Sequence, residues 1–365
     1  MAHVARVRYR AFHMLRRIVK GSGLAERVRA VWRHDAEQAM KPLRADLRRL
    51  QHEVERLSAA LADVSQRAAR GDQLAAQIKH VMEADSRDRE RLAAVDAVLG
   101  ERRIAAHVRD AVAAATIATE PYHHVVVDNL FPDDVYRLLI EALPPVEFFT
   151  QRDPVKQDLP LPIEFGPALS VRVWNFVDEV IAQRIVRPAI VDKFDVPLQM
   201  HYAEVFGPEF RDRARALPQA TSGGRLMLRR PGYHLDPHRD PKRSLVTCLL
   251  YLARPNDSDV HGTQIFRVED DIEAGYKQTY YPGQDGRRCE LVRVVPFRAN
   301  SMLAFLNARG AHGASIPADA PASLERYTYQ FYVAPRSDLL SELIRDLPKE
   351  RRAMWRNKAR VDAII

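Results

Sequence analysis

Two histidines and one aspartate in the C-terminal half of the chain have the residue types of a metal site. His238 and Asp240 stand two residues apart in PHRDP, and His312 follows far downstream in NARGAHGAS. Side chains at positions i and i+2 of an extended segment point to the same side, so the first two could bind one ion together. Two imidazoles and one carboxylate on one face of a metal leave its other face open, as in non-heme Fe(II) oxygenases. We therefore predict an iron site built from these three residues.

An arginine that could bind an acid cosubstrate lies further along the chain. Arg326 opens the segment RYTYQFYV, and Thr328 would share its face of a strand. The planar guanidinium group of arginine matches a carboxylate through two parallel hydrogen bonds, which lysine cannot offer. We expect both residues to bind the far carboxylate of 2-oxoglutarate. The keto-acid end would then occupy two open positions on the iron and leave the third for dioxygen.

Two other interpretations compete at this stage. His234 and Asp236 form a second His-x-Asp pair in the same stretch, HLDPHRD, and could replace His238 and Asp240 as ligands. In an interpretation without metal, His238 and Asp240 form a hydrogen-bonded turn, and Arg326 is one partner of a salt bridge.

Four segments together resemble a known family: PHRDPKRSLVTCLLYL, HGTQIF, FRANSMLAFLNARGAHGA and RYTYQFYV. They look like the catalytic core of the Fe(II)/2-oxoglutarate-dependent dioxygenases, and they are most similar to the prolyl-hydroxylase-like branch. The resemblance covers residues 121–336. It implies that His238, Asp240 and His312 bind iron and that Arg326 binds 2-oxoglutarate.

The resemblance adds further expectations about the ligand pair, the cofactors and the reaction. A proline before the first histidine fits the family, which favours His238 and Asp240 over the competing pair. Tyr251 falls where the branch has a tyrosine that contacts the far carboxylate of 2-oxoglutarate. Ascorbate is a further candidate cofactor. An aspartate at position 240, rather than glycine or alanine, favours hydroxylation over halogenation.

The sequence departs from the family pattern at two places that concern the substrate. His261-Gly262-Thr263 stands where the family has Gly-Gly, and the insertion Glu269–Glu290 is unfamiliar. The spacing from His312 to Arg326 is also long. Peptidyl, sugar and small-molecule substrates therefore all stay open.

The region around these residues reads as an all-β barrel. Short apolar segments with turn residues between them predict strands, namely RLMLRR, LVTCLLYL, TQIFRV, ELVRVV, SMLAFL and YTYQFYV. We predict an α+β protein with a double-stranded β-helix (jelly-roll) barrel and flanking helices. Residues 153–167 and 206–224 are predicted loops, and Asn307, Ala308 and Arg309 are expected to line the mouth of the site.

A heptad pattern precedes the barrel. Its apolar positions, called the heptad seam below, are spaced alternately four and three residues apart, which is typical of a coiled coil. They are Leu43, Leu47, Leu50, Val54, Leu57, Leu61, Val64 and Ala68. We predict a homo-oligomer formed through this helix, with a helix folded back on the enzyme as the alternative.

The predicted organisation has five parts. They are a basic amphipathic helix (1–35), a coiled-coil helix (36–100), a helical linker (101–120), the dioxygenase domain (121–336) and a helical tail (337–365).

Charge and composition limit the partners. The net charge of +8 is concentrated at the N-terminus, so residues 1–35 could contact an anionic membrane surface or flank the next helix as a solvated segment. Too few aromatic residues lie among the basic ones to favour nucleic acid. Two cysteines give no disulfide framework, and no apolar run approaches the roughly 20 residues of a spanning helix. We expect a cytoplasmic protein.

Two further functions stay open from the sequence. The chain could be a coiled-coil scaffold with a catalytically silent barrel, or a cupin-like metalloenzyme that does not use 2-oxoglutarate.

Overall fold

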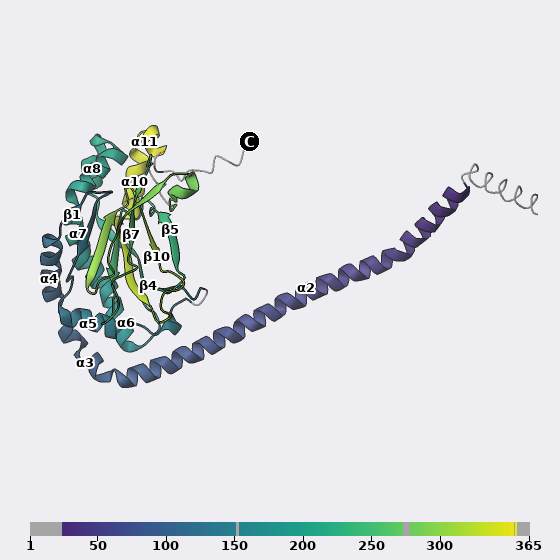
Figure 1. The fold of residues 1–365 in the computed structure, drawn as a ribbon, viewed down its shortest axis with the longest axis horizontal. Helices are drawn as coiled ribbons and strands as arrows, with labels where there is room; N and C mark the ends of the chain where they lie inside the picture. The colour runs from purple at the N-terminus through teal and green to yellow at the C-terminus, as the bar shows by residue number, and fades with distance from the viewer. Residues whose placement is uncertain (1–23, 151–152, 273–277, 354, 356–365) are drawn as a thin grey trace, which may run out of the picture. The chain divides into compact units, whose positions relative to one another are not determined.

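The computed structural model describes residues 24–150, 153–272, 278–353 and 355 (Figure 1). The chain divides into two compact units, Met1–Leu74 and Ala75–Ile365. Most of the predicted basic helix, residues 1–23, lies outside the described residues, so its contact with a membrane surface stays a prediction. Within the described part of the chain, no helix is long and apolar enough to cross a membrane.

One long helix, α2 (Leu24–Arg87), contains the heptad seam. Its described leucines and valines from Leu47 to Val64 are 57–68% exposed, as expected for a seam seen without a partner helix. The coiled coil therefore stays a prediction. The predicted boundary at residue 35 is wrong, because the helix continues through it.

The C-terminal end of α2 already belongs to the second unit. Gln77 donates a hydrogen bond to the backbone oxygen of Glu147 at 2.8 Å, and Asp85 accepts one from the backbone nitrogen of Ala168 at 2.7 Å. The predicted coiled-coil segment 36–100 is thus too long. Its last part packs within the second unit, together with the short helix α3 (Arg89–Val98) and its buried Val95.

The larger sheet of the second unit has seven antiparallel strands in the order β1-β2-β9-β6-β11-β4-β3. Their bounds are β1 (Ile117–Ala118), β2 (His124–Val127), β3 (Lys156–Pro160), β4 (Gln219–Arg229), β6 (Val246–Tyr251), β9 (Ser301–Leu306) and β11 (Arg326–Pro335). The smaller sheet has the order β5-β10-β7-β8. Its strands are β5 (His234–His238), β7 (Gln264–Val268), β8 (Cys289–Val294) and β10 (Ala311–Ser315).

Successive strands from β4 to β11 alternate between the two sheets, except that β7 and β8 are neighbours. This is the connectivity expected of a two-sheet jelly roll. An apolar cluster that includes Tyr251, Ile265, Phe297 and Phe305 joins residues of both sheets. The predicted α+β class with two antiparallel sheets and flanking helices is confirmed.

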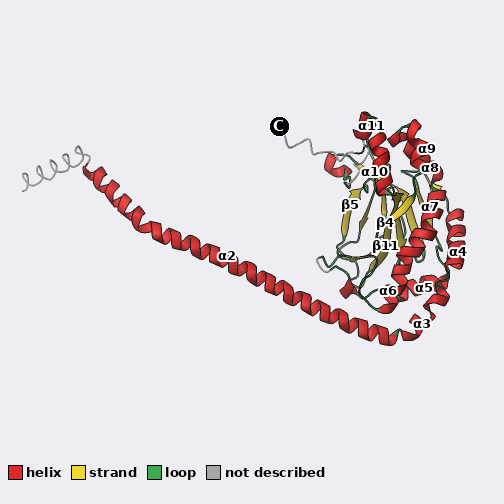
Figure 2. Cartoon of the chain, turned by 180° about the vertical axis from the view of Figure 1, so that it is seen from behind, coloured by secondary structure: helices red, strands yellow, loops and turns green. Residues whose placement is uncertain are grey.

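Helices cover one face of the larger sheet (Figure 2). They are α4 (Glu101–Ala114), α5 (Asp133–Glu141), α6 (Ala168–Phe176), the π-helical η2 (Val177–Val186), α7 (Arg187–Lys193), α8 (Asp195–Phe206) and α9 (Arg211–Arg215), with short 3-10 turns at η1 (Val146–Phe148) and η3 (Pro208–Phe210). The 3-10 turn η4 (Pro282–Asp285) contacts β5 of the smaller sheet instead. In α4, Ile104, Val108 and Val112 repeat every four residues and are buried in the main core. Helix α4, which lies in the predicted helical linker 101–120, therefore packs within the second unit.

Two predicted loops contain strands. The stretch 153–167 contains β3, and β4 begins inside the stretch 206–224, at Gln219. The prolines of the first stretch argued against a strand, but β3 is an edge strand that pairs with β4 alone, and prolines are tolerated at edges.

The C-terminal helices α10 (Ser337–Asp346) and α11 (Lys349–Ala353) follow β11 directly. Leu340 and Leu343 are buried in the main core, and Trp355 stacks on Phe206 with ring centroids 4.6 Å apart. The described part of the predicted tail 337–365 therefore packs within the second unit.

Candidate active site

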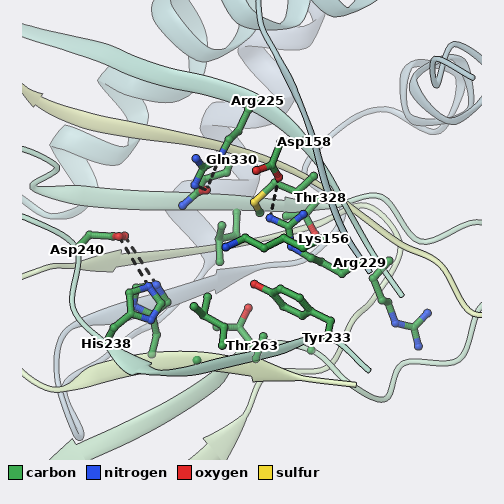
Figure 3. A pocket seen from close by; sticks show the side chains of 18 of the residues that line it. Lys156, Asp158, Arg225, Arg229, Tyr233, His238, Asp240, Thr263, Thr328 and Gln330 are labelled. Carbon is green, nitrogen blue, oxygen red and sulfur yellow. Dashed lines mark hydrogen bonds and ion pairs between the residues drawn. The ribbon is translucent and has the colours of Figure 1, made fainter. Parts of the chain in front are cut away.

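The register of the smaller sheet brings the predicted ligands together. His238 on β5 and His312 on β10 are partners across the two strands, and Asp240 follows β5 immediately. One ligand atom from each residue lies within 4.8 Å of the others, and all three side chains are buried (Figure 3). The Nε2 atoms of His238 and His312 lie 3.9 and 3.8 Å from the Asp240 carboxylate oxygens. Among the described residues, no other group of histidines, cysteines and acids has this geometry.

The competing pair lies at the surface. His234 and Asp236 hydrogen-bond to each other at 2.9 Å, and their side chains are 62% and 68% exposed. They form a hydrogen-bonded pair on the exposed side of β5, not in a turn. The backbone oxygen of Asp236 lies 2.9 Å from Nδ1 of His238. A proton on that nitrogen would leave Nε2 of His238 free to bind a metal.

Burial sets the protonation of the ligand residues. It is the main reason why the pKa of His312 falls well below its usual value, helped by the charges of His238 and Arg239. His312 is therefore neutral, the form in which imidazole binds metal. Burial also raises the pKa of Asp240, while His238, the Thr247 hydroxyl and Arg225 act in the opposite direction.

A hydrogen-bonded chain holds the aspartate. Thr247 donates to Asp240 Oδ2 at 2.8 Å, and the amide nitrogen of Asn307 donates to the Thr247 hydroxyl at 2.8 Å. Asn307 is only 2% exposed and also donates to the backbone oxygen of Ser244. The prediction that Asn307 lines the mouth is therefore wrong, because its amide is used inside the protein.

Its two neighbours do not line the mouth of the cavity either. Ala308 is buried, and its backbone oxygen accepts a hydrogen bond from Arg239 at 3.1 Å. Arg309 forms an ion pair with Glu204 at the surface.

Arg326 lies in the wall of the same cavity and has unused hydrogen-bonding capacity. It is 2% exposed, and its Nη2 donates to Ser258 Oγ at 3.0 Å and to the backbone oxygen of Val260 at 2.9 Å. Its Nε and Nη1 are buried with no partner among the described residues. Buried donors without partners are rare, and two on one guanidinium group leave hydrogen-bonding capacity that an anionic ligand could use. Burial lowers the pKa of Arg326, but an arginine stays charged.

Thr328 and Tyr251 lie beside this arginine. They are register partners on β11 and β6, and both line the cavity. The Tyr251 hydroxyl donates to Thr263 Oγ1 at 2.7 Å, and burial raises the pKa of Tyr251 to about 12. A protonated tyrosine hydroxyl and a threonine hydroxyl could therefore both face the cosubstrate.

The structure explains the departure at positions 261–263. A side chain at Gly262 would collide with the backbone oxygen of Val295, so only glycine fits there. Thr263 follows this glycine, and its hydroxyl accepts the hydrogen bond from Tyr251.

The ligand set and Arg326 share one cavity of about 530 Å³. It is also lined by residues that we did not predict, among them Lys156, Arg225 and Tyr281. Every second side chain of β4 faces the cavity. Once this strand is assigned, the alternation of strand side chains would identify Arg225 as a cavity residue. Lys156 lay in a predicted loop and gave no such signal.

Residues from the insertion Glu269–Glu290 also reach the site. The ring of Tyr281 stacks on His238 with centroids 5.6 Å apart. Arg239, which lies between the first two ligands in the chain, is 1% exposed and forms an ion pair with Asp271. It donates to the backbone oxygens of Gly310 at 3.0 Å and Ala308 at 3.1 Å. Nothing in the sequence of the insertion indicated these contacts.

Comparisons with known proteins give matches among solved structures only. No family model and no curated protein matches the sequence. The chain is similar to a Pseudomonas putida prolyl-4-hydroxylase, with 17% identity and a TM-score of 0.33 over 64% of this chain and 100% of that chain. It is also similar to an oxidoreductase of the 2OG-Fe(II) oxygenase family from Burkholderia pseudomallei (10% identity, TM-score 0.35, 64% and 90% covered).

A third similar structure is HygX from Streptomyces hygroscopicus with nickel, 2-oxoglutarate and hygromycin B bound (14% identity, TM-score 0.31, 59% and 83% covered). At such scores we argue function from the side chains of the site.

Proposed function

We propose that the protein is an iron- and 2-oxoglutarate-dependent dioxygenase that hydroxylates a C–H bond. One observation carries the proposal. His238, Asp240 and His312 converge in a cavity whose wall also holds Arg326, with two buried donors that no described residue uses.

The residues present fit a ferrous ion and 2-oxoglutarate. Two neutral imidazoles and one carboxylate are the ligand set that leaves positions open on iron, and the unused donors of Arg326 could bind a carboxylate. Iron bound there would supply oxidation of a C–H bond by dioxygen, coupled to conversion of 2-oxoglutarate to succinate and carbon dioxide.

The protein itself would orient the reactants. Asp236 fixes the ring of His238 through its backbone oxygen, and Thr247 fixes the Asp240 carboxylate. Such supporting bonds hold ligands in place and tune the metal. Arg326 and Thr328 would hold the far carboxylate, and the apolar cluster between the sheets would keep water from it.

Formation of succinate tests the proposal directly. Purified protein is incubated with Fe(II), 2-oxoglutarate and oxygen, with and without candidate substrates, and succinate is measured. We expect iron-dependent succinate from the wild type and from His234→Ala, and none from Asp240→Ala. An iron-loaded wild type that forms no succinate under any of these conditions would contradict the proposal.

The two competing functions make different demands on Arg326. A cupin-like metalloenzyme would not need a buried guanidinium group with unused donors in its cavity. A silent barrel would not need all four of the predicted residues to meet in one cavity. Both observations support the dioxygenase over these alternatives.

We further propose that the chain assembles through α2. The exposed apolar side chains of the heptad seam support this proposal, because such a row is normally covered by another helix.

A further inference from the structure

Four cations line the cavity in addition to Arg326, namely Lys156, Arg225, Arg229 and Arg243. Lys156 lies on β3, Arg225 on β4, and Arg243 in the segment that follows β5. Figure 3 shows the Lys156 side chain extending into the cavity, with Arg225 on the wall beside Gln330.

Carboxylates in the same cavity do not balance these charges. The acids that line it are Asp158 and Asp240. Asp158 pairs with Arg229 at 2.8 Å, and Asp240 belongs to the candidate ligand set. Lys156, Arg225 and Arg243 have no acidic partner within the described part of the chain.

Arg225 is held in place by a neutral group. Its Nε donates to Gln330 Oε1 at 2.9 Å, Nη2 donates to the same oxygen, and Nη1 makes no hydrogen bond to a described residue. This arrangement orients the guanidinium group without neutralising it, so its charge can act on a ligand.

The sheet register places these cations relative to the metal ligands. Arg225, Gln330 and Leu249 form one cross-strand row, and Tyr332 and Thr247 form the next row, where Thr247 donates to Asp240. Rows on one face are about 7 Å apart along the strands. Lys156 on β3 is the register partner of Arg229 on β4, and Arg229 lies four residues after Arg225 on that strand. Because the Lys156 side chain extends into the cavity (Figure 3), an anion held by Lys156 and Arg225 together could belong to a molecule of small-metabolite size that still reaches the metal ligands.

We propose that the substrate carries an anionic group, a phosphate or a carboxylate, which Lys156 and Arg225 bind while the reacting carbon lies at the metal site. Excess positive charge inside a cavity with apolar walls concentrates anions there. The inference rests on the proposed dioxygenase for the reaction, but the anion subsite can be measured by itself. It favours acidic small molecules over neutral sugars and uncharged peptides.

Titration calorimetry tests the subsite. The protein is loaded with Zn(II), which does not react with oxygen, and with 2-oxoglutarate, so that the metal positions and Arg326 are occupied. Inorganic phosphate and acetate are then titrated separately. We expect at least one of them to bind, with an affinity about tenfold lower in Lys156→Gln and in Arg225→Gln, because each loses a charge-assisted hydrogen bond. The tighter of the two anions identifies the group.

Two controls make the result specific. Lys156→Arg should restore binding, since it keeps the charge at an exposed position. Lys79→Gln, which removes a lysine with a 74% exposed side chain on α2, should bind as the wild type does. Anion binding that is absent, or equal in the wild type and in Lys156→Gln and Arg225→Gln, would overturn the inference.

Failure of the subsite and failure of the proposed function give different results. 2-Oxoglutarate that binds the Zn(II)-loaded protein without any anion binding refutes the subsite alone. If 2-oxoglutarate does not bind, the dioxygenase proposal fails. The titration with phosphate alone then still reports whether Lys156 and Arg225 form an anion site.

Discussion

His238 and His312 are separated by more than seventy residues in the chain, yet they are register partners on neighbouring strands, with ring centroids 4.1 Å apart. Replacing His312 by alanine should therefore remove one of three ligands and lower metal affinity at least about 100-fold, while the strands stay paired. Metal content after dialysis, or the visible spectrum of bound Co(II), measures this. His234→Ala is the matched control and should keep its metal. Loss of metal in His234→Ala but not in His238→Ala would assign the site to the other pair.

Thr247→Val should weaken the metal site without removing a ligand. Valine has nearly the shape of threonine but cannot donate to Asp240 or accept from Asn307, so the carboxylate loses its orientation. Loss of such a supporting bond lowers metal affinity by roughly 10–100-fold. Thr247→Ser keeps the hydroxyl and should retain most of the affinity. Equal metal affinity in the valine and serine variants would show that the hydrogen bond has no role.

Arg326→Ala should separate cosubstrate binding from metal binding. The variant loses the two donors that we assign to the far carboxylate, and 2-oxoglutarate affinity should fall by about 100-fold or more. Metal affinity should change little, because the guanidinium group is not a ligand. Calorimetry with 2-oxoglutarate on Zn(II)-loaded protein measures the first, and metal content the second. Unchanged 2-oxoglutarate affinity would favour the cupin-like alternative.

Leu57→Asp should disrupt assembly. Leu57 belongs to the heptad seam and is 59% exposed in the single chain, so a charge there would be buried only if a partner helix covers it. Light scattering should show a smaller mass for this variant than for the wild type. Ser58→Asp changes a neighbouring residue outside the seam and serves as control. A wild type that is monomeric at micromolar concentration would refute the coiled coil.

Asp178→Asn should stabilise the protein at neutral pH. Burial raises the pKa of Asp178 in the fold, so the contribution of this group to stability is complete below its unfolded pKa and is lost as pH rises through the folded pKa. Asparagine removes that loss and still accepts the hydrogen bond that Tyr329 donates at 2.7 Å. Urea unfolding of the metal-free protein should show a gain at pH 7 that shrinks towards pH 4. A gain that does not depend on pH would exclude the carboxyl group as its cause.

The sequence predicted the chemistry of the site better than its surroundings. The candidate ligands and Arg326 could be found because few side chains bind metals or carboxylates, and their order along the chain is informative. Thr247 could not be recognised, since it lies within an apolar strand where a threonine is usually a core residue. Lys156 was missed because the prolines around it suggested a loop, whereas the position of β3 at the sheet edge depends on tertiary pairing.

The helical parts show the same limit. Periodicity predicted that α2 is a helix, but it could not show where that helix starts to pack within the second unit. The heptad spacing and the spacing of an ordinary amphipathic face are similar over a few turns. For the same reason α4 was taken for a linker, although its valines and isoleucine face the main core.

The position of Arg239 would affect how an ion binds at the proposed metal site. Its hydrogen bonds to the backbone oxygens of Ala308 and Gly310 tie the end of β5 to the turn that precedes His312. These hydrogen bonds therefore connect the segments that carry the candidate ligands without the help of a bound ion. If the proposed site binds an ion, little conformational entropy would remain to be lost on binding, so the metal-free protein would already be preorganised for a scarce metal.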